Sequence, residues 1–220
     1  MNTPFIVITI APQLGAGGAP LGKRLAQRLG FKYFDDEILR MAAEKCGASA
    51  PDLQRWDEHR ARFWERVGGI FSMGAPDVGA HVLTPPPGTG AAVVIHDQEV
   101  FALQSEVIRE AAARHDCIFI GRAGFWVLRD HPGRIAVFLH APVEHRLPAV
   151  METFKTDAPR ARELISRLDE DRARFVRETT GQPLTPTTQD LCINTAAISL
   201  EDAEELIVKA VEIRRKKCAG

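Results

Sequence analysis

The chain has 220 residues and a formal net charge of −1 at pH 7, with 45% hydrophobic and 26% charged residues. This length fits one domain around one core, and the near-zero charge argues against a general nucleic-acid-binding protein. All apolar runs are shorter than the roughly 20 residues that span a bilayer, so no membrane association is expected. The four cysteines show no C-x-x-C spacing, which argues against a disulfide framework and favours reduced thiols in the cytoplasm.

The chain opens with a short, apolar, β-branched run at residues 5–10, which predicts a buried parallel strand. After a glycine-rich bend, Pro20 and the spacing of Leu21, Leu25 and Leu29 predict a helix that begins near residue 19. Glycines let the bend adopt positive φ and approach a ligand closely. Strand, bend and helix N-terminus together predict a phosphate-binding loop, with a plain tight turn as the alternative. The loop residues are Gly15, Ala16, Gly17, Gly18 and Ala19.

This loop lacks the side chains of a Walker A motif. A match to the spacing of that motif ends at Lys23, which would lie one full turn inside the helix. Counted from the end of the strand, the lysine position falls on Gly18. The hydroxyl position that would hold Mg²⁺ falls on Ala19 or Pro20. The usual protein ligands of Mg²⁺ are therefore absent, although the ion itself stays possible.

Strand and helix patterns alternate along the rest of the chain. The predicted strands are 30–34, 117–120, 134–139 and 190–194. The predicted helices are 37–46, 51–67, 97–113, 124–128, 142–154, 159–178 and 200–217. A loop is predicted at 68–90. Such alternation is typical of an α/β protein with a parallel sheet and helices on both faces. With the first run, it predicts five strands.

Polar residues follow several predicted strands, at the edge where parallel α/β sheets bind ligands. Arg122 comes directly after the strand at 117–120, where it could clamp a phosphate or form a structural salt bridge. Asp35 and Asp36 follow the second strand and could contact a substrate or metal, or cap the next helix.

The helix predicted at 159–178 carries arginine rather than lysine. Rigid guanidinium groups are well suited to grip a transferring phosphoryl group. Arg167, Asp171 and Arg174 share one face by helical spacing, and Arg172 lies elsewhere on the helix. Two interpretations stay open: a lid over a phosphate site, or a solvated helix with i,i+4 ion pairs.

Several short motifs, taken in order, resemble the cytidylate kinase-like family, a branch of the P-loop nucleoside monophosphate kinases. They are Ile8–Ile10, Gly15–Gly18, Gly22–Ala26, Tyr33–Ile38, Gln104–Glu110, Ile118–Ala123, Leu168–Ala173, Thr180-Gly181 and Asp190–Asn194. The resemblance implies one P-loop kinase-like domain over residues 1–220. Within it, 47–98 would be an acceptor-side helical and loop insertion, and 156–185 a helical lid.

The resemblance also implies an activity, namely transfer of the ATP γ-phosphate to CMP, dCMP or a similar small acceptor. The donor phosphates would bind at Gly15–Ala19, and the lid helix would close over both nucleotides. The implied catalytic residues are Arg167, Arg172 and Arg174, and the implied substrate-binding residues are Asp35, Asp36, Arg122 and Asp171. ATP and the acceptor are the expected partners, and a homodimer is left open.

The chain departs from the family pattern where charge would be expected. Ala19 replaces an arginine of the loop, and Ile120 and Ala123 replace carboxylates that flank the Gly-Arg pair in cytidylate kinases. Ala11-Pro12 stands in place of Ser-Arg. A catalytically impaired nucleotide-binding protein with a regulatory role is therefore the alternative. A third hypothesis is an interaction protein that docks through Trp56, Phe63 and Trp64.

Overall fold

The structure, a computed structural model, describes residues 4–34, 82–83, 93–94 and 97–219. The chain divides into two compact units, one of residues 1–35 with 108–220 and the other of residues 36–107, and each is described by itself. Several predicted features lie outside the described residues: Asp35, Asp36, the helices at 37–46 and 51–67, most of the insertion at 47–98, and Trp56, Phe63 and Trp64.

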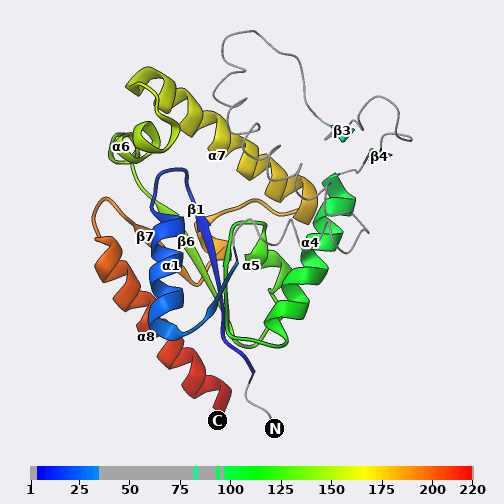
Figure 1. The fold of residues 1–220 in the computed structure, drawn as a ribbon. Coiled ribbons are helices and arrows are strands. Elements are labelled where there is room, and N and C mark those ends of the chain that lie inside the picture. Colours follow the sequence, from blue (N-terminus) through cyan, green and yellow to red (C-terminus); the bar gives the residue numbers. More distant parts are fainter. Residues whose placement is uncertain (1–3, 35–81, 84–92, 95–96, 220) are drawn as a thin grey trace. The chain divides into compact units, whose positions relative to one another are not determined.

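Five parallel strands form the sheet of the larger unit, in the order β2-β5-β1-β6-β7 (Figure 1). They are β1 Val7–Pro12, β2 Lys32–Phe34, β5 Cys117–Ile120, β6 Arg134–His140 and β7 Leu191–Asn194. β1 is central, because Ile10 pairs with Ile120 on one side and with Val137 on the other. The predicted five-stranded parallel sheet is confirmed, and the carboxyl ends of its strands meet at one edge.

Two helices, α1 (Gly18–Leu29) and α8 (Leu200–Ala219), cover one face of this sheet. Leu21 and Leu25 of α1 are fully buried in a core that also contains Ile8 of β1 and Ile207 of α8. Burying one such side chain is worth about 1.5–3 kcal/mol. α1 ends at Gly30, whose φ of 68° lets its N–H bond the carbonyl of Ala26.

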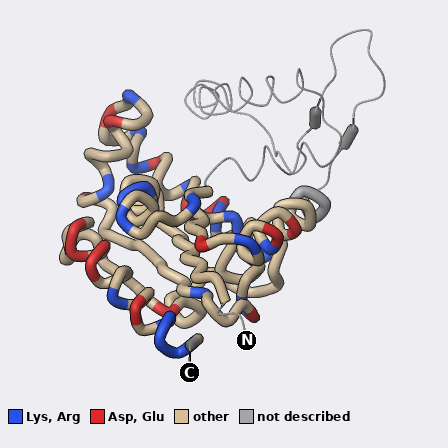
Figure 2. The backbone as a smooth tube through the Cα atoms, turned by 60° about the horizontal axis from the view of Figure 1, so that its bottom comes forward, with Lys and Arg blue, Asp and Glu red and all other residues tan. Residues whose placement is uncertain are grey.

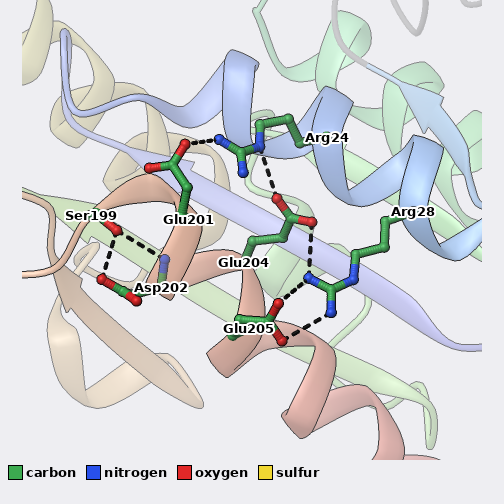
Figure 3. Close-up of polar contacts among 7 residues, drawn as sticks. All are labelled: Arg24, Arg28, Ser199, Glu201, Asp202, Glu204 and Glu205. Atoms are coloured by element: carbon green, nitrogen blue, oxygen red, sulfur yellow. Dashed lines mark hydrogen bonds and ion pairs between the residues drawn. The ribbon is translucent and has the colours of Figure 1, made fainter.

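Ion pairs join α1 to α8 (Figure 3). Glu204 has only 8% of its side chain exposed and accepts hydrogen bonds from Arg24 Nε at 2.8 Å and Arg28 Nη1 at 3.1 Å. Arg28 also binds Glu205 at 2.5 and 2.9 Å, and Arg24 also binds Glu201. The network fixes the start of α8 beside α1.

The charges of α8 run in the order that its helix dipole favours. Glu201 and Asp202 lie in the first turn, and Lys216 and Lys217 lie in the last. Figure 2 shows red at the start of α8 and blue at its end near the C-terminus, with both colours between them. Ser199 Oγ accepts from the N–H of Asp202 at 3.0 Å, which satisfies one free donor of the first turn (Figure 3).

The opposite face of the sheet is covered by α5 (Gly124–Val127) and by the last turn of α4 (Asp97–Ala112). A Cβ at Gly124 would lie 3.3 Å from Cγ2 of Thr9 on β1, so α5 packs closely on the sheet. In the last turn of α4, the carbonyl of Ala111 accepts from Cys117 Sγ at 3.5 Å. Helices therefore lie on both faces, as predicted.

The next two helices, α6 (Val143–Phe154) and α7 (Ala158–Thr180), pack against each other. Asp157 caps α7 by accepting from the N–H of Arg160 at 3.1 Å, and Gly181 ends it with a φ of 69°. α7 crosses the carboxyl end of β1 (Figure 1). A 3₁₀ turn at Pro186–Thr188 then leads to β7. The predicted lid region is thus built mainly from α7, and its role as a lid stays a prediction.

In the smaller unit, β3 (Val82–Leu83) and β4 (Val93–Val94) pair antiparallel. The sequence predicted a loop at 68–90 and therefore no strand at Val82–Leu83. Two residues are too few for hydrophobic alternation to signal a strand. Across the described part of the chain, no helix combines the length and apolarity that a bilayer crossing needs.

Candidate functional site

The loop between β1 and α1 forms a turn that ends at a helix N-terminus. Gly15 and Gly17 have φ values of 80° and 84°, in the left-handed region that glycine adopts at little cost. The N–H of Ala16 bonds the carbonyl of Gln13 at 3.0 Å. Gly17 is the N-cap of α1 and offers no side-chain cap. Because the first N–H groups of a helix have no partner within it, they are available to an anion.

Close packing explains why these loop positions are glycines. A Cβ at Gly15 would lie 2.8 Å from the carbonyl oxygen of Arg146, and one at Gly17 would lie 2.7 Å from Leu200 Cδ2. A Cβ at Gly18 would lie 2.6 Å from Cβ of Pro12. The Pro12 ring therefore occupies the space that a lysine would need at position 18.

Asp169 of α7 and Arg146 of α6 hold the same loop from outside. Asp169 Oδ1 accepts from the N–H of Leu14 at 2.9 Å. Arg146 Nη1 donates to Asp169 Oδ2 at 2.6 Å and to the carbonyl of Leu14 at 3.0 Å. Only 5% of the Arg146 side chain is exposed, and its buried Nε has no partner among the described residues. One positive and one negative side chain, Arg146 and Asp169, thus hold the loop between β1 and α1.

Arg172 brings a second guanidinium to this point. Its Nη1 donates to the carbonyl of Pro12 at 2.5 Å and lies 3.4 Å from Asp169 Oδ1. Burial lowers the pKa of Arg172, and the nearby charges of Arg122 and Arg146 lower it further, although Asp169 opposes them. Arg146 and Arg172 thus share one carboxylate beside the loop, and Arg122 is close enough to Arg172 to affect its charge. Their excess positive charge favours a bound anion.

Arg122 lies in a strained turn at the end of β5. Gly121, Arg122 and Ala123 have φ values of 67°, 56° and 50° in succession. The left-handed conformation costs about 1–2 kcal/mol for each residue that has a Cβ. Such strain is typical of functional sites, where the surrounding structure maintains it. The turn is held by hydrogen bonds from the N–H of Gly121 to Ile10 at 2.8 Å and from that of Gly124 to Gly121 at 3.0 Å.

A small pocket of about 30 Å³ lies between this turn and α7. Arg122 and Arg172 provide its positive charge, and Thr9 of β1 is the other polar residue that lines it. The remaining walls are backbone or apolar: Ile10, Ala11, Gly121, Ala123, Phe125, Phe175, Val176 and Leu184.

The other predicted arginines of α7 lie in a separate, exposed group. Asp171 pairs with Arg174, and its Oδ2 lies 3.8 Å from Arg167 Nε. About 42% of the Arg167 side chain and 58% of the Arg174 side chain are exposed. The three residues share a face as the helical spacing implied, whereas Arg172 is the α7 arginine that contacts Pro12. Roles for Arg167, Asp171 and Arg174 in catalysis or binding stay predictions.

Sequence reasoning did not select Arg146 and Asp169. The helix pattern offered one signal for Arg146. Helical spacing puts it on the same face as the apolar Leu147 and Val150, where a charged residue is unusual. Nothing in the sequence distinguishes Asp169 from its acidic neighbours Glu170 and Asp171.

The described residues do not fit a metal ion held by the protein. Among residues 4–34 and 97–219, no three His, Cys, Asp or Glu side chains are grouped as metal ligands. Asp169, the carboxylate at the loop, is already bound to Leu14, Arg146 and Arg172. ATP is different, since the glycine cradle and the arginines beside it fit its phosphates.

Comparisons with known proteins point to one family. The model of the Cytidylate kinase-like family matches residues 7–197. A "Cytidylate kinase" of Solibacter usitatus (strain Ellin6076) is 26% identical over 220 residues, which cover 95% of this chain and 93% of that protein. A "Cytidylate kinase" of Fervidobacterium nodosum (strain ATCC 35602 / DSM 5306 / Rt17-B1) is 23% identical, covering 96% and 97%.

Similarity to a solved structure supports the fold and says nothing about the activity. The crystal structure of an uncharacterized protein from Eubacterium ventriosum ATCC 27560 has a TM-score of 0.67 at 18% identity. The match covers 94% of this chain and 98% of that one.

Proposed function

Because the chain belongs to the cytidylate kinase-like family, we propose that it transfers the γ-phosphate of ATP to CMP, dCMP or a similar small acceptor. The observation that carries this proposal is that Arg146 and Arg172 contact the glycine loop, while Arg122 lines a pocket together with Arg172. Phosphoryl transfer depends mainly on positioning and on neutralising charge, and both are supplied by groups of this kind.

In this proposal, the N–H groups of Gly15–Ala19 bind the donor phosphates at the start of α1. Arg172 and Arg146 supply the charge that a Walker lysine would provide. A lysine at position 18 would collide with the ring of Pro12. Asp169 is a positioning residue, because it holds both arginines and the Leu14 N–H.

The reaction forms one bond and breaks one. An oxygen of the acceptor's phosphate attacks the γ-phosphorus of ATP, and the bond between that phosphorus and the bridging oxygen breaks. ADP leaves with the electron pair, so the products are ADP and a nucleoside diphosphate. Arg122 and Arg172 would stabilise the negative charge on the transferring group, and no step is assigned to a metal ion.

The exposed arginines Arg167 and Arg174 have a secondary place in the proposal. Both pair with Asp171, and closure of α7 over bound nucleotides could free them to contact phosphates. Asp35 and Asp36 would contact the acceptor, as the family resemblance implies.

One observation favours the alternative of a nucleotide-binding protein without turnover. Gly18, Ala19 and Pro20 stand where the loop's lysine and hydroxyl would be. Such a protein would bind ATP or CMP at the same loop and arginines and release both unchanged.

A panel of nucleotides distinguishes the kinase from the nucleotide-binding protein without turnover. The protein is incubated with ATP and with CMP, dCMP, UMP or AMP, with and without Mg²⁺, and ADP and diphosphate products are measured alongside binding by calorimetry. ADP formation that depends on CMP or dCMP supports the kinase. Binding without product supports the alternative, and the absence of any nucleotide binding contradicts both.

A further inference from the structure

Thr9 carries a buried hydroxyl that the fold does not use. It lies in the middle of β1 with 2% of its surface exposed. Its Oγ1 has no hydrogen-bond partner among the described residues. The threonine methyl packs toward Gly124, where a Cβ would be 3.3 Å away. Valine would fill the same space without a buried unpaired hydroxyl, so packing alone does not account for threonine.

The pocket beside Thr9 explains where the hydroxyl could find a partner. Thr9 is one of its lining residues, together with the guanidinium-bearing Arg122 and Arg172. A volume of about 30 Å³ is of the size that one oxygen-sized group occupies. Two cations and a threonine whose hydroxyl lacks a partner line this space, and together they match an oxygen of a phosphate monoester.

The position of the pocket separates it from the donor loop. Its lining comes from the ends of β1 and β5, from α5 and from α7, and includes none of residues 13–18. Arg172 belongs to both places, since it lines the pocket and also donates to the carbonyl of Pro12 at the start of the loop. A phosphoryl group moving from the loop to an acceptor in the pocket would pass this arginine.

We propose that Thr9 Oγ1 donates a hydrogen bond to a phosphate oxygen of the acceptor, which enters the pocket between Arg122 and Arg172. The proposal rests on the proposed function and adds to it a residue that fixes the acceptor's phosphate. The left-handed turn at Gly121–Ala123 holds the Arg122 side of this pocket in place. The anion would also relieve the crowding of like charges around Arg172.

Thr9→Val and Thr9→Ser test this inference, because valine keeps the shape and serine keeps the hydroxyl. Dissociation constants of CMP, cytidine and ATP are measured by calorimetry for wild type and both variants, together with Tm. A hydrogen bond to a charged oxygen corresponds to roughly a 10-fold to 100-fold effect. We expect Thr9→Val to bind CMP at least about 10-fold more weakly, with ATP and cytidine affinities unchanged and Tm equal or higher. Thr9→Ser should bind CMP like wild type.

Other outcomes overturn the inference in distinguishable ways. If Thr9→Val binds CMP as wild type does, the hydroxyl does not contact the acceptor, and the proposed function stands. A lower Tm with unchanged CMP affinity would show that Thr9 binds only a structural water. Equal losses for CMP, cytidine and ATP would show general damage to the site. If the wild type binds neither CMP nor ATP, the proposed function fails together with the inference.

Discussion

Asp169 is the residue on which the geometry of the candidate site depends. Its carboxylate receives hydrogen bonds from the N–H of Leu14, from Arg146 and from Arg172. Without this charge, the buried Arg146 and the half-buried Arg172 would keep only carbonyl partners near the loop. A single carboxylate therefore links β1, α6 and α7.

We expect Asp169→Asn to lower the free energy of unfolding by about 2–4 kcal/mol, because it leaves buried positive charge uncompensated. Urea denaturation measures this loss. Asp171→Asn is the matched control, since its ion pairs with Arg167 and Arg174 are partly exposed. That variant should lose about 1 kcal/mol or less. Equal losses in the two variants would contradict the buried role of Asp169.

Restoring a Walker lysine should not create a better enzyme. In Gly18→Lys, the new Cβ would collide with Pro12, and overpacking of this kind costs about 1–3 kcal/mol. We expect a lower Tm and no gain in ATP affinity. Adding Pro12→Ala should recover part of the stability, because it removes Cγ of the ring, which also collides, while the contact with Cβ stays. A stable single variant with tighter ATP binding would show that the ring does not exclude the lysine.

At the scale of residues, the sequence located the loop and Arg122 at strand ends, because glycines and the ends of apolar runs can be recognised within a few neighbouring residues. It did not locate Arg146 or Asp169. The contact between Leu14 and Asp169 spans 155 positions along the chain, and no local pattern encodes a contact of that separation.

At the scale of elements, α1 and α8 are joined by the ion-pair network around Glu204 (Figure 3). Hydrogen bonds from Arg24 and Arg28 hold the pKa of Glu201 and Glu205 below their usual 4.5. Their carboxylates are therefore more easily ionised in the folded chain. The stability that they contribute is fully present above pH 4.5 and is lost as the pH falls through the lowered folded pKa.

We therefore expect Tm to fall as the pH is lowered below 4.5, and Arg28→Met to lose part of that dependence. Thermal unfolding followed by circular dichroism over a pH series measures both slopes. Lys23→Met serves as control, because Lys23 is an exposed residue of α1 that is not among the residues pairing with α8. An identical pH slope in wild type and Arg28→Met would contradict a role for the α1–α8 network.

Element positions in the larger unit were largely predictable from apolar periodicity. Gly30 is an exception, because the sequence placed it in the second strand whereas it ends α1. The β3–β4 pair was not predictable, because two-residue strands in a Gly- and Pro-rich stretch carry no period.

At the scale of the larger unit, the strand order brings the candidate site together. β1 lies between β5 and β6. Loop residues follow β1, Arg122 follows β5, and Arg146 lies in the helix after β6, so three neighbouring strand ends supply them. The alternation of strands and helices predicted a parallel sheet, but not which strands are neighbours. That order depends on packing between distant segments, which no single stretch of sequence reveals.

The central claim is that Arg146 and Arg172 replace the lysine of the phosphate loop. Its most direct test is the rate of CDP formation from saturating ATP and CMP in Arg172→Ala, with Arg162→Ala as control. Arg162 is an α7 arginine that pairs with Glu144 and is 53% exposed. Loss of a cation that stabilises the transferring group lowers the rate by about 10³-fold or more. We predict that loss for Arg172→Ala, with unchanged folding and a near wild-type rate for Arg162→Ala. A folded Arg172→Ala protein that forms CDP at the wild-type rate would contradict the claim.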